Sequence, residues 1–143
     1  MEITIREMTV DDALSVKDLS WQLGYPLSID ETVQNIKAVV TSAERVAFVA
    51  EYNGKIVGWI GASQAVMIEV MPHCEINGLV IDKDFQGKSV GKFLIEKVKE
   101  WARKKGNKKL SLHCNVKRAE AHQFYFHIGF KDLKQQTNFV MEI

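Results

Sequence analysis

A short segment rich in small residues, Gln86-Gly87-Lys88-Ser89-Val90-Gly91-Lys92, gives the clearest chemical signal in the sequence. It lies between a stretch with the alternation of a strand and one with the periodicity of a helix. The first backbone N–H groups of a helix lack intrahelical partners, and the helix dipole favours anions there. Small residues would let an anion approach the main chain closely. The segment therefore predicts a cradle for a phosphate or pyrophosphate group; the alternative is a strand-to-helix turn that binds nothing.

Two common phosphate-binding motifs do not fit this segment. A Walker P-loop has the pattern G-x-x-x-x-G-K-[ST], but Gly87 and Gly91 are one residue too close together and Phe93 stands where the hydroxyl residue belongs. The dinucleotide-binding fingerprint is G-x-G-x-x-G after a first strand, and these two glycines do not complete it. Both classes of site are therefore disfavoured.

The segment resembles instead the Q/R-x-x-G-x-G/A signature of the GNAT superfamily of N-acetyltransferases. Gln86 and Gly91 match the signature, whereas Ser89 replaces its usual middle glycine. Serine is small, but the replacement puts the backbone angles at this position in question. The resemblance implies that the loop wraps the pyrophosphate of acetyl-coenzyme A.

The residues on both sides of the loop extend this resemblance. The stretch from Glu75 to Asp82 is similar to the family's fourth strand, which parts from the fifth strand at a bulge and pairs its main chain with the pantetheine arm. A glycine inside a strand, here Gly78 after Asn77, also predicts a bulge or a close backbone approach. The pattern further on resembles the family's C-terminal motif: Asn115-x-x-Arg118-x-x-Ala121-His122-x-Phe124-Tyr125-x-x-x-Gly129-Phe130.

The resemblance implies a set of coenzyme-binding residues and no metal. The two lysines of the loop are expected to meet the phosphates, and Asn115 at the end of the fifth strand is expected either to bond the pantetheine amides or to serve only as a strand-end residue. The full set is Leu79, Val80, Ile81, Gln86, Gly87, Lys88, Ser89, Val90, Gly91, Lys92, Asn115 and Tyr125.

Acetyl transfer from a thioester to an amine requires a neutral amine and a proton for the departing thiolate. A lysine-type amine has a pKa of about 10.4, so only about one in two thousand is neutral at pH 7, and a general base must help. The family's matching tyrosine makes Tyr125 the expected general acid; a core tyrosine on an apolar helix face is the alternative. Glu75 is the expected base; the alternative is that it is an ordinary outward-facing strand residue. His73 and His122 are weaker candidates for the base.

The elements that position these residues follow from periodicity and turn chemistry. Asn53-Gly54 between apolar runs predicts a hairpin, and Thr9 and Ser28 each open a helix with a capping box. Predicted strands are 2–8, 46–52, 55–63, 74–82, 109–115, 130–134 and 137–143. Predicted helices begin after Thr9, Ser28 and Ser89, and a fourth helix, marked by Ala121, Phe124, Tyr125 and Ile128, ends at Gly129. The fold class is α/β: the GNAT fold, one mixed sheet of about seven strands and about four helices, parted between its fourth and fifth strands.

The first helix pair is expected to form the wall of the acceptor site. By resemblance, the segment 21–30 fills this role, with Trp21, Tyr25 and Leu27 supplying aromatic or apolar surface. The alternative is that these side chains pack the two helices together.

Length and composition limit the remaining possibilities. The 143 residues predict a single domain spanning 1–143. The formal net charge of +1 argues against a nucleic-acid binder. The basic segment 103–109 is interpreted as a solvated helix end rather than a nucleic-acid patch, since cations suit a helix C-terminus. The start of the chain lacks a signal-peptide pattern and no apolar run approaches about 20 residues. We therefore expect a cytoplasmic protein with reduced thiols and no membrane partner.

Together these features predict an N-acetyltransferase that moves an acetyl group from acetyl-coenzyme A to a primary amine by direct attack in a ternary complex. The alternatives are a non-catalytic coenzyme A sensor of the same fold and a nucleotide-binding regulatory domain. The apolar C-terminal run, residues 137–143, would benefit from cover and predicts a homodimer.

Overall fold

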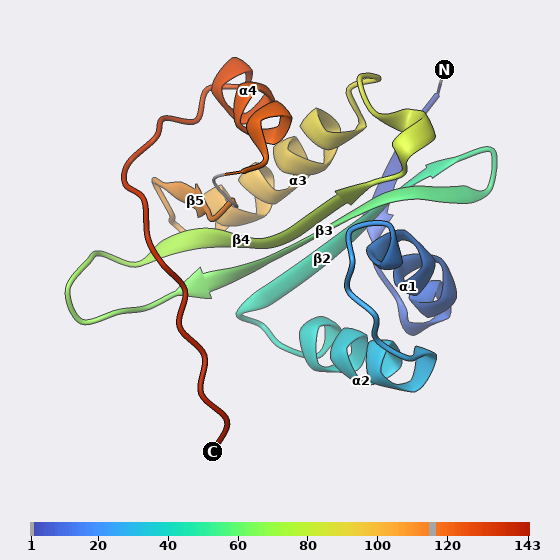
Figure 1. Ribbon diagram of the computed structural model, residues 1–143, viewed down its shortest axis with the longest axis horizontal. Coiled ribbons are helices and arrows are strands. Elements are labelled where there is room, and N and C mark those ends of the chain that lie inside the picture. Colours follow the sequence, from blue (N-terminus) through green and yellow to red (C-terminus); the bar gives the residue numbers. More distant parts are fainter. Residues whose placement is uncertain (1, 115–116) are drawn as a thin grey trace. The chain divides into compact units, whose positions relative to one another are not determined.

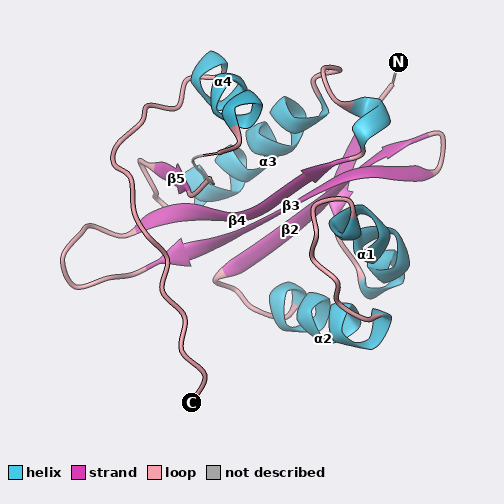
Figure 2. Ribbon diagram, in the orientation of Figure 1, coloured by secondary structure: helices cyan, strands magenta, loops and turns pink. Residues whose placement is uncertain are grey.

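The computed structural model describes residues 2–114 and 117–143. The chain forms two compact units, one ending at Leu112 and the other beginning at His113. The first unit contains five strands, two 3-10 turns and three helices (Figures 1 and 2): β1 (Thr4–Glu7), η1 (Val10–Asp12), α1 (Ala13–Trp21), α2 (Ile29–Val40), β2 (Arg45–Tyr52), β3 (Lys55–Ala65), β4 (His73–Ile81), η2 (Lys83–Phe85), α3 (Val90–Lys104) and β5 (Leu110–Leu112). The second unit contains α4 (Ala119–His127).

The strands form one mixed sheet in the order β1-β2-β3-β4-β5. The first three pairings are antiparallel, and β4 pairs with β5 in parallel. The predicted hairpin between β2 and β3 is confirmed. Its turn places Asn53 and Gly54 at φ angles of 50° and 76°, and a positive φ at both positions is what a type I′ hairpin turn requires.

Both predicted capping boxes are present, with one difference. Ser28 Oγ accepts a hydrogen bond from the backbone of Glu31, whose carboxylate accepts one from the backbone of Ser28, and α2 begins at once. The carboxylate of Asp12 likewise accepts from the backbone N–H of Thr9. There the chain first forms η1, so that α1 begins only at Ala13.

Helices cover both faces of the sheet, and Figure 1 shows α3 on the opposite side of the strands from α1 and α2. The α1–α2 side buries an apolar cluster that includes Val16, Leu19 and Ile36 from the helices and Val49 and Val80 from the strands. On the other side, α3 buries one stripe at helical spacing: Val90, Gly91, Leu94, Ile95, Val98 and Ala102. Burial of these two faces is the main force that holds the strands and hence the loop before α3 in place.

The fold class is confirmed, but the sheet has five strands rather than about seven. The predicted strands 130–134 and 137–143 are wrong, because this segment has no regular structure among the described residues. A strand requires a hydrogen-bonding neighbour, and an isolated two-stranded hairpin is marginal in water. The apolar side chains of Phe139, Val140 and Met141 are exposed instead. Within the described residues, no helix is both long and apolar enough to span a bilayer.

Candidate active site

The fourth and fifth strands part soon after they meet. The pairing joins Cys74–Ile76 of β4 to Leu110–Leu112 of β5, but β4 continues to Ile81. Within the described residues, the last part of β4 therefore has no strand neighbour on the β5 side. An open strand edge presents N–H and C=O groups to which an extended amide-containing chain can add. The predicted coenzyme contacts Leu79, Val80 and Ile81 lie in this open part.

A bulge in β4 begins where the strands part, as the sequence predicts. Gly61 of β3 pairs with Gly78 and Ala62 pairs with Ile76, so Asn77 is the additional residue on β4. Such a bulge bends its strand and disturbs the ladder locally. The bend at Asn77 follows directly on the last parallel pair, and it accounts for the end of the β4–β5 pairing.

The turn from β4 to α3 is held by a buried carboxylate. Asp82 is only 6% exposed, its Oδ1 accepts a hydrogen bond from the backbone N–H of Asp84 at 3.0 Å, and its Oδ2 lies 3.7 Å from Nζ of Lys55. Its own backbone N–H donates to the carbonyl of Val57 at 2.9 Å. These contacts attach the turn to the sheet, while the loop residues that follow it, 86–89, are exposed and accessible to a ligand.

The loop itself has the backbone conformation of a close-approach turn. Gly87 and Ser89 have φ angles of 75° and 68°, the left-handed region that favours glycine. The middle position of the signature thus requires the geometry that glycine provides, and the serine adopts it. Space is not the reason at Gly87, since an added Cβ there would meet nothing within 4 Å.

The N-terminus of α3 is left open to an anion. The Ser89 side chain does not cap the helix and its first turn has no acidic residue, whereas α2 begins with a capping box and two acidic residues. The nearby charges are those of Lys88, whose Nζ lies 5.4 Å from the centre of the Phe85 ring, and Lys92. The unpartnered amides, the helix dipole and the two lysines together favour a bound phosphate or pyrophosphate.

Glu75 lies two residues before the bulge. It pairs across the sheet with Ser63 of β3 and Ser111 of β5. Cys74 and Ile76 on either side of it are buried, and alternation along the strand places Glu75 on the opposite face from these two. His73 begins the same strand, and its Nδ1 lies 3.1 Å from the carbonyl oxygen of Met71.

The segment between α1 and α2 keeps its apolar side chains at the surface. Trp21, Tyr25 and Leu27 are 55%, 62% and 39% exposed, which argues against the alternative that they pack the two helices together. Trp21 Nε1 donates a hydrogen bond to the carbonyl of Leu27 at 3.0 Å, which orders the segment.

Tyr125 belongs to the second unit, on α4. Its ring contacts those of Phe124 and Phe130, and its carbonyl accepts a hydrogen bond from the backbone of Phe130. Burial, followed by the influence of Cys114, raises the pKa of the Tyr125 hydroxyl, and Arg118 opposes this. The phenol is therefore protonated at neutral pH. His122 lies on the same helix, and the predicted contact Asn115 lies outside the described residues.

A family model described as the acetyltransferase (GNAT) family matches residues 13–130. This range contains every predicted coenzyme and catalytic residue. The chain belongs to the GNAT family. Acetyl-coenzyme A is the co-substrate of GNAT acetyltransferases, and no group of three or more His, Cys, Asp or Glu residues that could hold a metal occurs in the described part of the chain.

Two relatives and one solved structure show which proteins this GNAT chain is similar to. An uncharacterized N-acetyltransferase of Methanocaldococcus jannaschii is 36% identical over 59% of the chain, a match that spans 38% of the archaeal protein's own length. The aminoglycoside N(6′)-acetyltransferase type 1 of Stenotrophomonas maltophilia is 26% identical over 98% of the chain and 94% of that protein. The structure of AAC(6′)-Iy in complex with a bisubstrate analogue has a TM-score of 0.88 at 18% identity, with full coverage of both chains, and shows the shared fold.

Two residues that support the site of this GNAT protein were not predicted from the sequence. Asp82 anchors the turn before the loop, and the Asp-x-Asp spacing with Asp84 was a usable signal for such a capped turn. Trp59 packs over the bulge at Gly78. It had no local signal, because the contact joins two strands that the sequence separates by nearly twenty residues.

Proposed function

We propose that this GNAT protein transfers the acetyl group of acetyl-coenzyme A to a primary amine by direct attack in a ternary complex. The observation that carries the proposal is the continuity of two open main-chain surfaces. The free edge of β4 from Gly78 to Ile81 leads through the Asp82 turn to the uncapped, lysine-flanked start of α3. The first surface suits an amide-containing arm and the second suits a pyrophosphate, and both are parts of coenzyme A.

Two side chains would then act on the reacting groups. The acceptor nitrogen attacks the thioester carbonyl, a new C–N bond forms, and the C–S bond breaks with the electron pair leaving on sulfur. Glu75 takes the proton that the amine loses, directly or through water, and Tyr125 gives a proton to the thiolate. The raised pKa of Tyr125 keeps its hydroxyl protonated at neutral pH, so a proton is available for the thiolate.

The acid is tested by Tyr125→Phe. We expect a fall in kcat of about a hundredfold or more, while calorimetry gives an unchanged Kd for acetyl-coenzyme A. The matched control is Tyr52→Phe, which removes a hydroxyl from a half-buried tyrosine of β2 outside the predicted site. Equal turnover in Tyr125→Phe and the native protein would remove this role, and coenzyme binding without turnover on any amine would instead favour a sensor.

The acceptor we propose is a primary amine carried by a small polar molecule or a peptide. The name of the Stenotrophomonas maltophilia relative describes acetylation of an aminoglycoside amine, and the exposed Trp21, Tyr25 and Leu27 offer a wall for the non-reacting part of an acceptor. A screen of aminoglycosides, alkylamines and peptide amines by mass spectrometry would identify the class. A parallel panel of alcohols without amines is the control, and acetylation confined to that panel would contradict the proposal.

We also propose that two copies associate through the C-terminal segment. Phe139, Val140 and Met141 are more than four-fifths exposed, and a second copy can supply the strand partner that the segment lacks. Light scattering should give the mass of a dimer, and a chain truncated after residue 136 should give that of a monomer. A monomer at high concentration in the native protein would refute the association.

A further inference from the structure

The loop between β3 and β4, residues 66–72 and here called the apolar loop, exposes aliphatic side chains. Its sequence is Val-Met-Ile-Glu-Val-Met-Pro, with one charged residue. Ile68 is fully exposed, Met71 is 82% exposed and Val66 is 74% exposed. Soluble monomers rarely expose contiguous apolar surface without a function for it. A patch of this kind therefore requires an explanation in terms of a partner.

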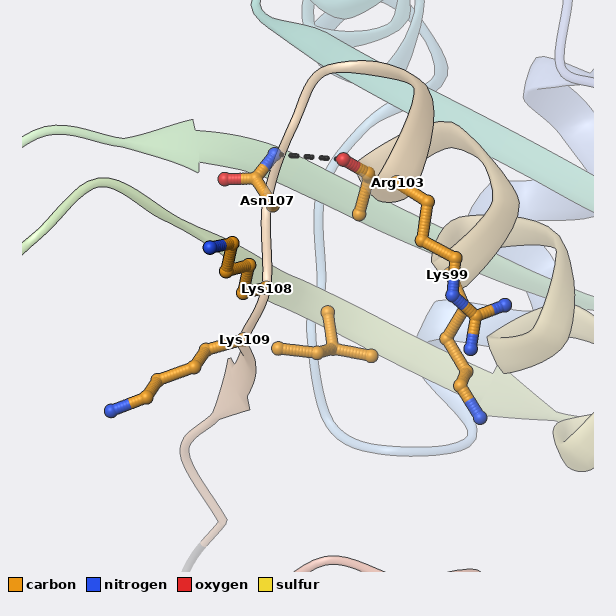
Figure 3. Close-up of a pocket in the computed structure, with 7 residues that line it drawn as sticks. Lys99, Arg103, Asn107, Lys108 and Lys109 are labelled. Carbon is orange, nitrogen blue, oxygen red and sulfur yellow. Dashed lines mark hydrogen bonds between the residues drawn. The ribbon is translucent and has the colours of Figure 1, made fainter.

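The last two residues of α3 and the turn that leads to β5, residues 103–109 and here called the basic turn, carry five cations and no acidic residue. All five are exposed. The rest of the chain is net negative, because the protein as a whole carries only +1. Figure 3 shows a pocket along this turn, with Lys108 and Lys109 pointing away from α3 and Lys99 and Arg103 at its other side. Lys99 is paired with Glu96 at 3.1 Å, so the lysines of the turn dominate the surface charge.

The apolar loop and the basic turn are fastened to each other. The side-chain amides of Gln64 and Asn107 exchange two hydrogen bonds, each of 2.8 Å. Gln64 is next to the last residue of β3, and the backbone N–H of Cys74, near the start of β4, donates to the carbonyl of Lys109 at 3.1 Å. Both segments thus lie at one end of the sheet, where β5 begins and the β3–β4 loop projects (Figure 1). They form one surface with an apolar tip and a cationic base.

We propose that this surface docks the protein onto an anionic lipid membrane. Aliphatic side chains at the tip enter the boundary between headgroups and acyl chains, while the lysines bind the negative headgroups, which is how peripheral proteins combine the two forces. Such docking needs no spanning helix. The proposal departs from the sequence-based expectation of no membrane partner, which rested on the lack of an apolar run long enough to span a bilayer.

Other partners match this surface less well. A nucleic acid would engage the lysines but would leave the aliphatic tip in water. A second copy meeting the first through the same surface would bring both basic turns into one interface, because a two-fold contact uses the same surface on both copies. A lipid surface satisfies both halves.

Docking through this end leaves the coenzyme site open. The basic turn lies at the C-terminal end of α3, and the Gln86–Gly91 loop lies at its N-terminal end. The fifteen residues of that helix span about 22 Å at 1.5 Å per residue. The proposal is therefore independent of catalysis, and variants of this surface should retain acetylation of a water-soluble amine.

The test is vesicle co-sedimentation of the full chain, with vesicles of phosphatidylcholine alone and of an equimolar mixture with phosphatidylserine. The mixed vesicles should bind the protein at least tenfold more strongly, and added salt should weaken this binding. Lys108→Ser/Lys109→Ser should weaken it about fivefold for each lysine removed. Ile68→Ser/Met71→Ser should weaken it about tenfold, because two apolar side chains no longer leave water.

The matched control is Leu133→Ser/Lys134→Ser, which removes an exposed apolar side chain and a lysine from the second unit. It should bind as the native protein does, and circular dichroism confirms that all variants fold. Failure to bind the mixed vesicles, equal binding to both vesicle types, or equal loss in the control would overturn the proposal. Tighter binding to a short RNA than to the mixed vesicles, unchanged by Ile68→Ser/Met71→Ser, would also overturn it. So would self-association of the native protein that the loop and turn variants abolish, if no vesicle binding is seen.

Discussion

The indole ring of Trp59 lies against the α-carbon of Gly78, so closely that an added Cβ would sit 2.7 Å from the ring's Cη2 and 2.9 Å from its Cζ3. The two residues belong to neighbouring strands, β3 and β4, and Gly78 immediately follows the bulge. The ring also packs against the apolar cluster beneath α1 and α2. The part of β4 that does not pair with β5 therefore begins beneath a large ring, and only glycine leaves room for that ring.

Gly78→Ala should lower the free energy of unfolding by about 1–3 kcal/mol, the usual cost of overpacking, as measured by urea denaturation. Gly61→Ala is the matched control on the paired strand, because a Cβ there would meet the same ring at an ordinary 3.7 Å. In a Trp59→Phe background the ring is smaller, and the cost of Gly78→Ala should shrink. Equal costs for the two glycines would show that the ring does not constrain the bulge.

Ser89→Gly should stabilise the protein by about 1 kcal/mol. An L-residue in the left-handed region costs about 1–2 kcal/mol, and glycine removes this cost. Part of the benefit is lost because glycine also raises the entropy of the unfolded chain. Ser28→Gly is the control, since that serine caps α2 at a φ of −73° and its replacement costs a few tenths of a kcal/mol. Thermal unfolding of both variants should show a stability gain for Ser89→Gly and a small loss for Ser28→Gly. Destabilisation by Ser89→Gly would mean that the Ser89 side chain supports the loop.

Low pH should reduce the free energy of unfolding through protonation of Asp12. The Arg6 guanidinium donates hydrogen bonds of 2.7 and 2.9 Å to this buried carboxylate and holds its pKa below the usual range, although burial acts in the opposite direction. A lowered folded-state pKa contributes stability above the unfolded value of about 3.9, and that stability is lost as the pH falls through the folded value.

Asp12→Asn should therefore cost about 2 kcal/mol at pH 7, and the gap from the native protein should close as the pH falls below about 4. Urea unfolding at several pH values measures this gap. Asp11→Asn, at the exposed neighbouring position, should show no such gap at any pH. A gap that stays constant down to pH 3 would assign the effect of Asp12→Asn to packing rather than charge.

Local rules predicted most of the elements that hold the loop. The Asn53-Gly54 turn, the Ser28 capping box and the bulge at Asn77 each depend on residues close together in sequence, and all three are present. The parallel pairing of β4 with β5 followed from the helix between them.

Contacts between distant segments were harder to predict. The position of Trp59 over Gly78 depends on strand register, and the Gln64–Asn107 amide pair joins residues 43 positions apart. The C-terminal run has the composition of a strand, but composition does not supply the neighbouring edge that a strand must join. Sequence reasoning failed at residues 130–143 for that reason. The catalytic roles of Tyr125 and Glu75 stay predictions.

The central claim is that coenzyme A binds along the open edge of β4 and the start of α3. Titration of the isotope-labelled full chain with acetyl-coenzyme A, followed by amide NMR, tests it most directly. The largest shifts should fall on the amides of 78–81 and 87–92, and inorganic pyrophosphate should reproduce only those of 87–92. Saturable binding that shifts other amides and leaves both segments unchanged, or no binding at all, would contradict the claim.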